Sequence, residues 1–181
     1  MKKVRVISAE EAALMVQDGD TVTTGGFLVC GCPETLSKAI ERRFLDTGHP
    51  RDLTLFFAAG QGYRNGTGGD HYGHEGLVKR VIGGHWDRAA KLGEMALNNQ
   101  IEAYNLPQGV ISHMYRDIAA HKLGTLTHVG LYTFVDPRNG GGKLNTRTTE
   151  DLVKLVQIEG EERLLYKVFP IQICLLRASF C

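Results

Sequence analysis

The chain has 181 residues, 43% of them apolar and 23% charged, which is the composition of a folded globular protein and excludes a disordered one. Lysine and arginine number 21 against 20 acidic residues, and a net charge of +1 leaves no basic surplus for binding nucleic acid or an anionic membrane surface. The sequence contains neither a signal peptide nor an apolar run of about 18 residues, so we expect a cytoplasmic protein without membrane spans.

The first part of the chain predicts a helix, a strand, a glycine turn and a second helix. Ser8 begins a capping box for a short helix. The β-branched run 21–24 predicts a strand, which breaks into Gly25 and Gly26. Pro33 then suits the first position of a helix with apolar residues at helical spacing.

The rest of the chain continues the alternation of strands and helices. The predicted elements are a strand at residues 53–59, a glycine-rich loop leading to 75–82, a helix at 91–99, a strand at 102–105, a helix at 110–121, a strand at 129–135, a helix opened by Thr148 or Thr149, a strand pair within 152–166 and an apolar run at 168–176. This order predicts an α/β fold with a mostly parallel open sheet and crossover helices. Ligands of such sheets bind beyond the carboxyl ends of the strands, where the glycine clusters fall.

The last residues predict an incomplete domain. Residues 168–181 have the composition of a buried strand, but no polar exit or covering helix follows them. A buried strand needs neighbours on both sides. We therefore expect residues 1–181 to be a truncated domain.

Two glycine-rich segments fail as nucleotide-binding motifs. Gly60, Gly62 and Gly66 follow a strand, but their spacing is one residue too long for the dinucleotide fingerprint. The later glycine triplet is no phosphate-binding loop, because Pro137 stands where its first glycine is required and Leu144 where serine or threonine should bind magnesium. Nucleotide cofactors are therefore not predicted.

A metal site is not predicted either. His71, His74, Glu75 and the nearby His85 do not have the spacing of a helical zinc motif, and we interpret the histidines as solvated or bonded to backbone. No serine lies in the glycine-flanked elbow of a hydrolase. The cysteines also lack zinc or redox spacing and are interpreted as reduced thiols: Cys30, Cys32, Cys174 and Cys181.

Gln108 is the candidate catalytic residue. It lies between Pro107 and Gly109 at a strand-to-helix turn, so its amide can donate to an oxygen that develops negative charge. The alternative is a turn glutamine bonded to local backbone, which the spacing alone favours.

Four stretches together carry a family resemblance. The stretches are residues 25–34, which contain Gly-Gly-Phe; residues 75–86, which contain Gly-His-Trp; residues 104–109, which contain Pro-Gln-Gly; and residues 133–143, which contain Asp-Pro-Arg. In register over the whole chain, they resemble family I coenzyme A transferases, and within them the propionate and acetate branch, whose two halves are fused in one chain. The resemblance implies the fold shared with sugar-phosphate isomerases and a transfer of CoA between acyl-CoA and short-chain acids.

The resemblance also implies a mechanism and a site. In the family a glutamate attacks the acyl-CoA thioester and becomes a glutamyl-CoA thioester in a ping-pong exchange. By similarity Gln108 helps to form the oxyanion hole, and CoA is a substrate rather than a permanently bound cofactor. The residues expected at the CoA and substrate site are Gly25, Gly26, Phe27, Gly31, Gly60, Gln61 and Gly109. Phe27 has an equal alternative as a core residue, and the full-length family member is expected to be a homo-oligomer.

The family's nucleophilic glutamate lies in the second half of its chain, beyond residue 181. None of the glutamates present matches that residue, and four of them are interpreted as helix or loop charges on solvated faces: Glu11, Glu34, Glu41 and Glu75. We therefore expect the isolated chain to be inactive. The competing interpretations are a sugar-phosphate isomerase or sensor of the same fold, and a degenerate product that acts only as a binding partner.

Overall fold

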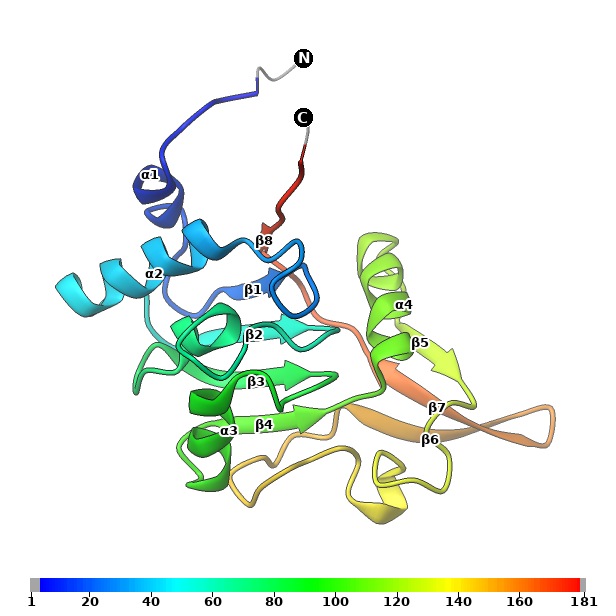
Figure 1. Cartoon of the computed structure of the whole chain (residues 1–181). Helices are drawn as coiled ribbons and strands as arrows, with labels where there is room; N and C mark the ends of the chain where they lie inside the picture. The colour runs from blue at the N-terminus through cyan, green and yellow to red at the C-terminus, as the bar shows by residue number, and fades with distance from the viewer. Residues whose placement is uncertain (1–3, 180–181) are drawn as a thin grey trace.

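The computed structural model of the protein describes residues 4–179 and contains two sheets (Figure 1). The main sheet is parallel throughout and has the strand order β4-β3-β2-β1-β8. Its strands are β1 (Thr21–Thr24), β2 (Leu53–Phe57), β3 (Val78–Gly83), β4 (Glu102–Asn105) and β8 (Ile173–Leu175). A smaller antiparallel sheet has the order β5-β7-β6, with β5 (Gly124–Thr127), β6 (Val153–Ile158) and β7 (Glu161–Lys167).

The helices divide between the two faces of the main sheet. They are α1 (Ala9–Ala13), α2 (Glu34–Thr47), α3 (Ala90–Leu97), α4 (Gln108–Ala119) and the short 3-10 helices η1 (Gly68–Tyr72) and η2 (Pro137–Asn139). On one face, Leu55 and Phe57 of β2 belong to the same core as buried residues of α1, α2 and α3. Between them in sequence, Phe56 points to the other face and packs with Met114 of α4 and Leu164 of β7. The helix α4 and the antiparallel sheet thus cover this second face.

The beginning of the fold follows its local sequence signals. Ser8 Oγ accepts from Glu11 N at 3.0 Å and Glu11 Oε2 accepts from Ser8 N at 2.9 Å, so the predicted capping box is present. Pro33 is the N-cap residue of α2 rather than its first helical residue. The helix ends at Gly48, whose φ of 75° provides the left-handed C-cap that glycine allows.

The strand predicted at 129–135 is wrong. Gly130 and Tyr132 have φ values of 102° and 64°, and the hydroxyl of Thr133 donates to Gly130 O at 2.7 Å, so the segment is a series of turns. The strand lies upstream, at β5, where Gly124 permits a close approach to β7: a Cβ there would lie 2.7 Å from Tyr166 O.

The helix predicted to open at Thr148 or Thr149 is also wrong. Thr148 is buried, and its hydroxyl accepts from Ala103 N at 2.7 Å, so it extends the contacts of β4 instead of capping a helix. The strand pair predicted within 152–166 is confirmed as the hairpin of β6 and β7.

The end of the chain is only partly the buried strand that was predicted. The strand β8 has three residues and pairs with β1 alone, while Leu176 after it is 69% exposed. Residues 180 and 181 of that prediction lie outside the described residues. Between residues 4 and 179, no helix is long and apolar enough to span a membrane.

Candidate functional site

Gln108 is the first residue of α4, which the two residues Leu106 and Pro107 join to the carboxyl end of β4. Leu106 N donates to Gly83 O at 3.1 Å, which ties the turn before Gln108 to the end of β3. Gly84 permits this approach, because a Cβ there would lie 3.2 Å from Gln108 Cα and would collide with Ala58 O. The side chain of Gln108 is therefore held at the edge of the sheet where ligands bind in open α/β folds.

The amino end of α4 offers several hydrogen-bond donors. The N-cap residue is Pro107, and no side chain caps the helix. Because the first N–H groups of a helix have no intrahelical acceptor, those of the first turn of α4 remain available, and the helix dipole makes this end positive. Within residues 4–179 the side-chain amide of Gln108 makes no hydrogen bond, so the alternative of an amide bonded to local backbone is not what the structure shows. This end suits an oxygen that carries negative charge.

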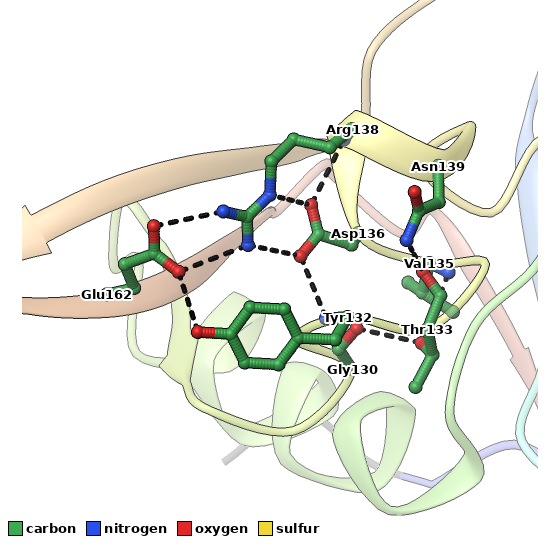
Figure 2. A network of polar contacts seen from close by, with 8 residues as sticks. All are labelled: Gly130, Tyr132, Thr133, Val135, Asp136, Arg138, Asn139 and Glu162. Carbon is green, nitrogen blue, oxygen red and sulfur yellow. Dashed lines mark hydrogen bonds and ion pairs between the residues drawn. The ribbon is translucent and has the colours of Figure 1, made fainter.

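The chain segment just before Gln108 is hydrogen-bonded to the segment 129–142. Asn105 N donates to Gly142 O at 2.8 Å. Figure 2 shows how these residues are fixed: the Arg138 guanidinium contacts the Asp136 carboxylate at 2.7 Å and Glu162 of β7 at 3.0 Å, and it lies over the Tyr132 ring. The hydrogen bonds from Arg138 hold the pKa of the Asp136 carboxyl well below its ordinary value. The network joins the antiparallel sheet to the candidate site.

The segment 25–32 forms a folded loop after β1. Gly26 has a φ of 113°, and a Cβ there would lie 2.7 Å from Cys32 N, so only glycine fits where the loop closes on itself. Gly31, with a φ of 72°, makes the return turn. Phe27 is 59% exposed, so its interpretation as a core residue is wrong, and its ring is free to line a site.

A second loop, after β2, is joined to the first. Leu28 N donates to Gly60 O at 2.9 Å, and Gln61 Nε2 donates to Thr24 O at 3.0 Å. Gln61 is 5% exposed, so its amide holds the two loops together. A Cβ on Gly60 would lie 2.5 Å from the His85 ring, which explains the glycine there.

The predicted site residues thus gather along one edge of the sheet in two groups. Gly25, Gly26, Phe27, Gly31, Gly60 and Gln61 belong to the linked loops after β1 and β2, and Gln108 and Gly109 belong to the turn after β4. Their roles in binding remain predictions.

Sequence reasoning missed a buried cluster behind the glycine-rich loop. The side chain of His71 is 4% exposed, with Nδ1 2.5 Å from Glu41 Oε2 and Nε2 2.7 Å from Glu34 Oε1. His74 Nε2 lies 2.6 Å from the other oxygen of Glu41. The interpretation of Glu41 as a solvated charge and of His71 as solvated or backbone-bonded is therefore wrong. A seven-residue spacing on α2 places both glutamates on one helix face, a signal that the sequence did contain.

This cluster is a hydrogen-bonded network of two carboxylates and two imidazoles. Burial raises the pKa of Glu41, but the hydrogen bonds from His74 and His71 outweigh it and hold the pKa below its ordinary value of 4.5. Glu34 also accepts from Gly68 N at 3.0 Å, which fastens the glycine-rich loop to α2. The described part of the chain holds no group of three or more histidine, cysteine, aspartate or glutamate side chains placed to bind a metal ion.

The chain is an α/β protein with an uncapped helix end and glycine loops at the carboxyl edge of a parallel sheet, the edge where proteins of this fold class bind their ligands. Residues 6–180 match the family described as Coenzyme A transferase, and the chain belongs to that family.

Similar proteins agree with this assignment. The chain is 42% identical to a caffeate CoA-transferase of Acetobacterium woodii over 97% of its own length and 33% of the relative's. It is 40% identical to the acetate CoA-transferase YdiF of Escherichia coli K12, over 99% and 34% of the two chains. The crystal structure of YdiF from E. coli O157:H7 as a thioester complex with CoA superposes with a TM-score of 0.91 at 38% identity, covering 95% of this chain and 34% of that one. The chain thus spans about a third of the length of these relatives.

Proposed function

We propose that the chain forms part of the acyl-CoA site of a transferase that moves CoA between acyl-CoA and short carboxylic acids such as acetate or propionate. The observation that carries the proposal is the uncapped amino end of α4 with Gln108 as its first residue, in a chain of this family. In this proposal the chain acts as the N-terminal part of a cytoplasmic, homo-oligomeric enzyme, and residues outside these 181 supply the nucleophile.

The proposed reaction proceeds by ping-pong exchange. A glutamate carboxylate attacks the thioester carbonyl carbon, and the oxygen of the tetrahedral intermediate accepts a hydrogen bond from the Gln108 amide. The C–S bond breaks to give an acyl-glutamyl anhydride and CoA thiolate, which attacks the glutamyl carbonyl and releases the first acid. The second acid then takes CoA from the glutamyl thioester by the reverse steps. Removing a single oxyanion donor lowers kcat by about 10²–10³.

Three of the described glutamates are paired with other side chains, and by the family resemblance the nucleophile lies outside these 181 residues. Glu34 and Glu41 are engaged by His71, and Glu150 pairs with Arg80 and Lys167. We therefore expect the purified 181-residue chain to show no exchange of CoA between acetyl-CoA and labelled propionate. Detectable exchange that depends on the chain would contradict this part of the proposal.

Binding by the chain alone tests the role of Gln108. Isothermal titration with acetyl-CoA should show saturable binding that Gln108→Ala weakens about two- to tenfold, the equivalent of one neutral hydrogen bond. Gln100→Ala is the matched control, because Gln100 is also an exposed glutamine and lies outside the candidate site. Equal affinity of both variants and the wild type would refute the assignment of Gln108.

Two other candidates remain open to the same kind of test. The amino end of α4 would also suit a phosphate, as in a sugar-phosphate isomerase or sensor of this fold. A rise in melting temperature with a sugar phosphate, and none with acetyl-CoA, would favour that class. A non-enzymatic binding partner would bind neither ligand, and its open β8 edge with exposed Leu176 would favour concentration-dependent association.

A further inference from the structure

Asp136 is a buried carboxylate at the centre of the turns that lead to Gly142. Its Oδ2 accepts from Tyr132 N at 2.9 Å, and its Oδ1 accepts from Arg138 N at 3.0 Å. The carbonyl oxygen of Asp136 accepts from Gly141 N at 3.0 Å. This residue therefore closes the turns on both of its sides. A buried carboxylate that loses its charged partner strongly destabilises the structure around it, so the turns depend on what pairs with Asp136.

Arg138 is that partner, and its guanidinium bridges two carboxylates (Figure 2). Its Nε and Nη2 donate to the two oxygens of Asp136 at 2.9 and 2.7 Å. Its Nη1 and Nη2 donate to the two oxygens of Glu162, on β7, at 3.0 and 3.1 Å. Each carboxylate is thus bound through both oxygens, an arrangement that suits the planar fork of a guanidinium. Arg138 ties the turns to the antiparallel sheet.

The turns that Arg138 fixes are bonded in turn to the chain before Gln108. Gly142 N donates to Phe134 O at 3.1 Å, and Gly142 O accepts from Asn105 N at 2.8 Å. Only two residues separate Asn105 from Gln108. The end of β3 supports this stretch on one side, and Gly142 supports it on the other. A displacement of the turns would therefore displace the amino end of α4.

Building on the proposed function, we propose that Arg138 is a positioning residue, which holds the Gln108 amide at the place where it donates to the thioester oxygen. Arg138 acts through Asp136 and the backbone of the turns, without contact to the acyl-CoA. A hydrogen-bond donor stabilises developing charge only while it is held within about 0.5 Å of the productive position. Glu162 contributes as the second acceptor, which keeps the guanidinium in its plane.

Neighbouring glutamates on β7 provide matched variants for the test. Glu162 binds Arg138, whereas Glu161 pairs with Arg163 and its side chain is 67% exposed. Consecutive residues of a strand point to opposite faces, so the two glutamates differ in partner but not in type. Glu162→Ala retains the pair of Arg138 with Asp136, which keeps the test valid if Arg138→Ala fails to fold.

The first measurement compares ¹⁵N spectra of the ligand-free 181-residue chain and its variants. Glu162→Ala should shift the backbone amide of Asn105 and the side-chain amide of Gln108, whereas Glu161→Ala should leave both in place. Unshifted signals in Glu162→Ala, or equal shifts in the two variants, would overturn the inference.

A double-mutant cycle then separates positioning from a loss of stability alone. In isothermal titration of the folded variants with acetyl-CoA, Arg138→Ala should weaken binding about two- to tenfold, as Gln108→Ala does. Because Arg138 acts through Gln108, the double variant should bind no more weakly than Gln108→Ala. Additive losses, or an unchanged affinity in Arg138→Ala, would contradict this coupling.

The outcomes separate this inference from the proposed function. A wild-type chain without saturable affinity for acetyl-CoA would refute the proposed function, while selective shifts in ligand-free Glu162→Ala would still support the hold of Arg138 on Gln108. A wild-type chain that binds acetyl-CoA, with an affinity that Arg138→Ala leaves unchanged, would overturn the positioning role and leave the CoA site standing.

Discussion

Gly142 holds the turn that carries Gln108, and alanine at this position should destabilise the protein more than alanine one residue earlier. Gly142 has a φ of 77°, and a Cβ there would lie 2.9 Å from Asn105 O and 3.0 Å from Leu106 Cδ2. The left-handed backbone costs an L-residue about 1–2 kcal/mol, and overpacking adds about 1–3 kcal/mol. The free energy of unfolding should therefore fall by roughly 2–5 kcal/mol in Gly142→Ala.

Gly141→Ala is the matched control for this prediction. Gly141 has a φ of 66°, but a Cβ there meets nothing closer than Pro137 Cα at 3.8 Å, so only the backbone cost applies. In urea unfolding followed by circular dichroism, Gly142→Ala should lose about 1–3 kcal/mol more than Gly141→Ala, at an unchanged m-value. Equal losses in the two variants would refute the argument that Gly142 is fixed by the turn before Gln108.

Three further predictions concern the rest of the fold. The depressed pKa of Glu41 contributes stability that is present above about pH 4.5 and is lost as the pH falls below it. Glu41→Gln should therefore flatten the acid branch of the stability curve, measured by urea unfolding from about pH 6 to 3. An unchanged dependence of the unfolding free energy on pH would contradict the pairing of Glu41 with His74 and His71. Met114→Ala, in the core, should lower the free energy of unfolding by about 2–5 kcal/mol, whereas Met15→Ala, at an exposed site, should lower it by about 0.5 kcal/mol or less. Similar melting temperatures for the two variants would contradict the burial of α4. Ser8→Ala should cost about 0.5–2 kcal/mol through the lost cap, and an unchanged denaturation midpoint would exclude a contribution of α1.

The parallel sheet could be predicted because each of its parts has a strong local signal. The β-branched run of β1 and the apolar run of β2 are short and end at glycines, and the helix between them follows a proline. The predicted helices at 91–99 and 110–121 correspond to α3 and α4 with shifts of one or two residues at their ends. Local signals failed where the fold is decided by contacts distant in sequence.

The antiparallel sheet shows this limit. Residues 129–135 are as apolar as a strand, but Asp136 accepts from Tyr132 N at 2.9 Å and bends them into turns. Threonine is a residue type that often caps helices, but the hydroxyl of Thr148 accepts a hydrogen bond from the backbone N–H of Ala103, 45 residues away. Neither partner can be read from a window of neighbouring residues.

The candidate site was predictable in its positions but not in its chemistry. The glycines and the Pro-Gln-Gly turn lie together at the carboxyl edge of the sheet, as their positions after strands predicted. That Gln61 is buried against Thr24, and that His71 lies between two carboxylates, depends on side-chain packing between elements, which the spacing of residues does not encode.

The central claim is that the amino end of α4 receives the acyl-CoA carbonyl, and a map of backbone amide shifts tests it most directly. In a titration of the ¹⁵N-labelled chain with acetyl-CoA, the amides of Gln108, Gly109 and Val110 should show saturable shifts, together with those of Gly25 and Gly26. Saturable shifts confined to the cavity between α4 and β5, which Arg116, Asp117 and Lys122 line, or an unchanged spectrum, would contradict the claim.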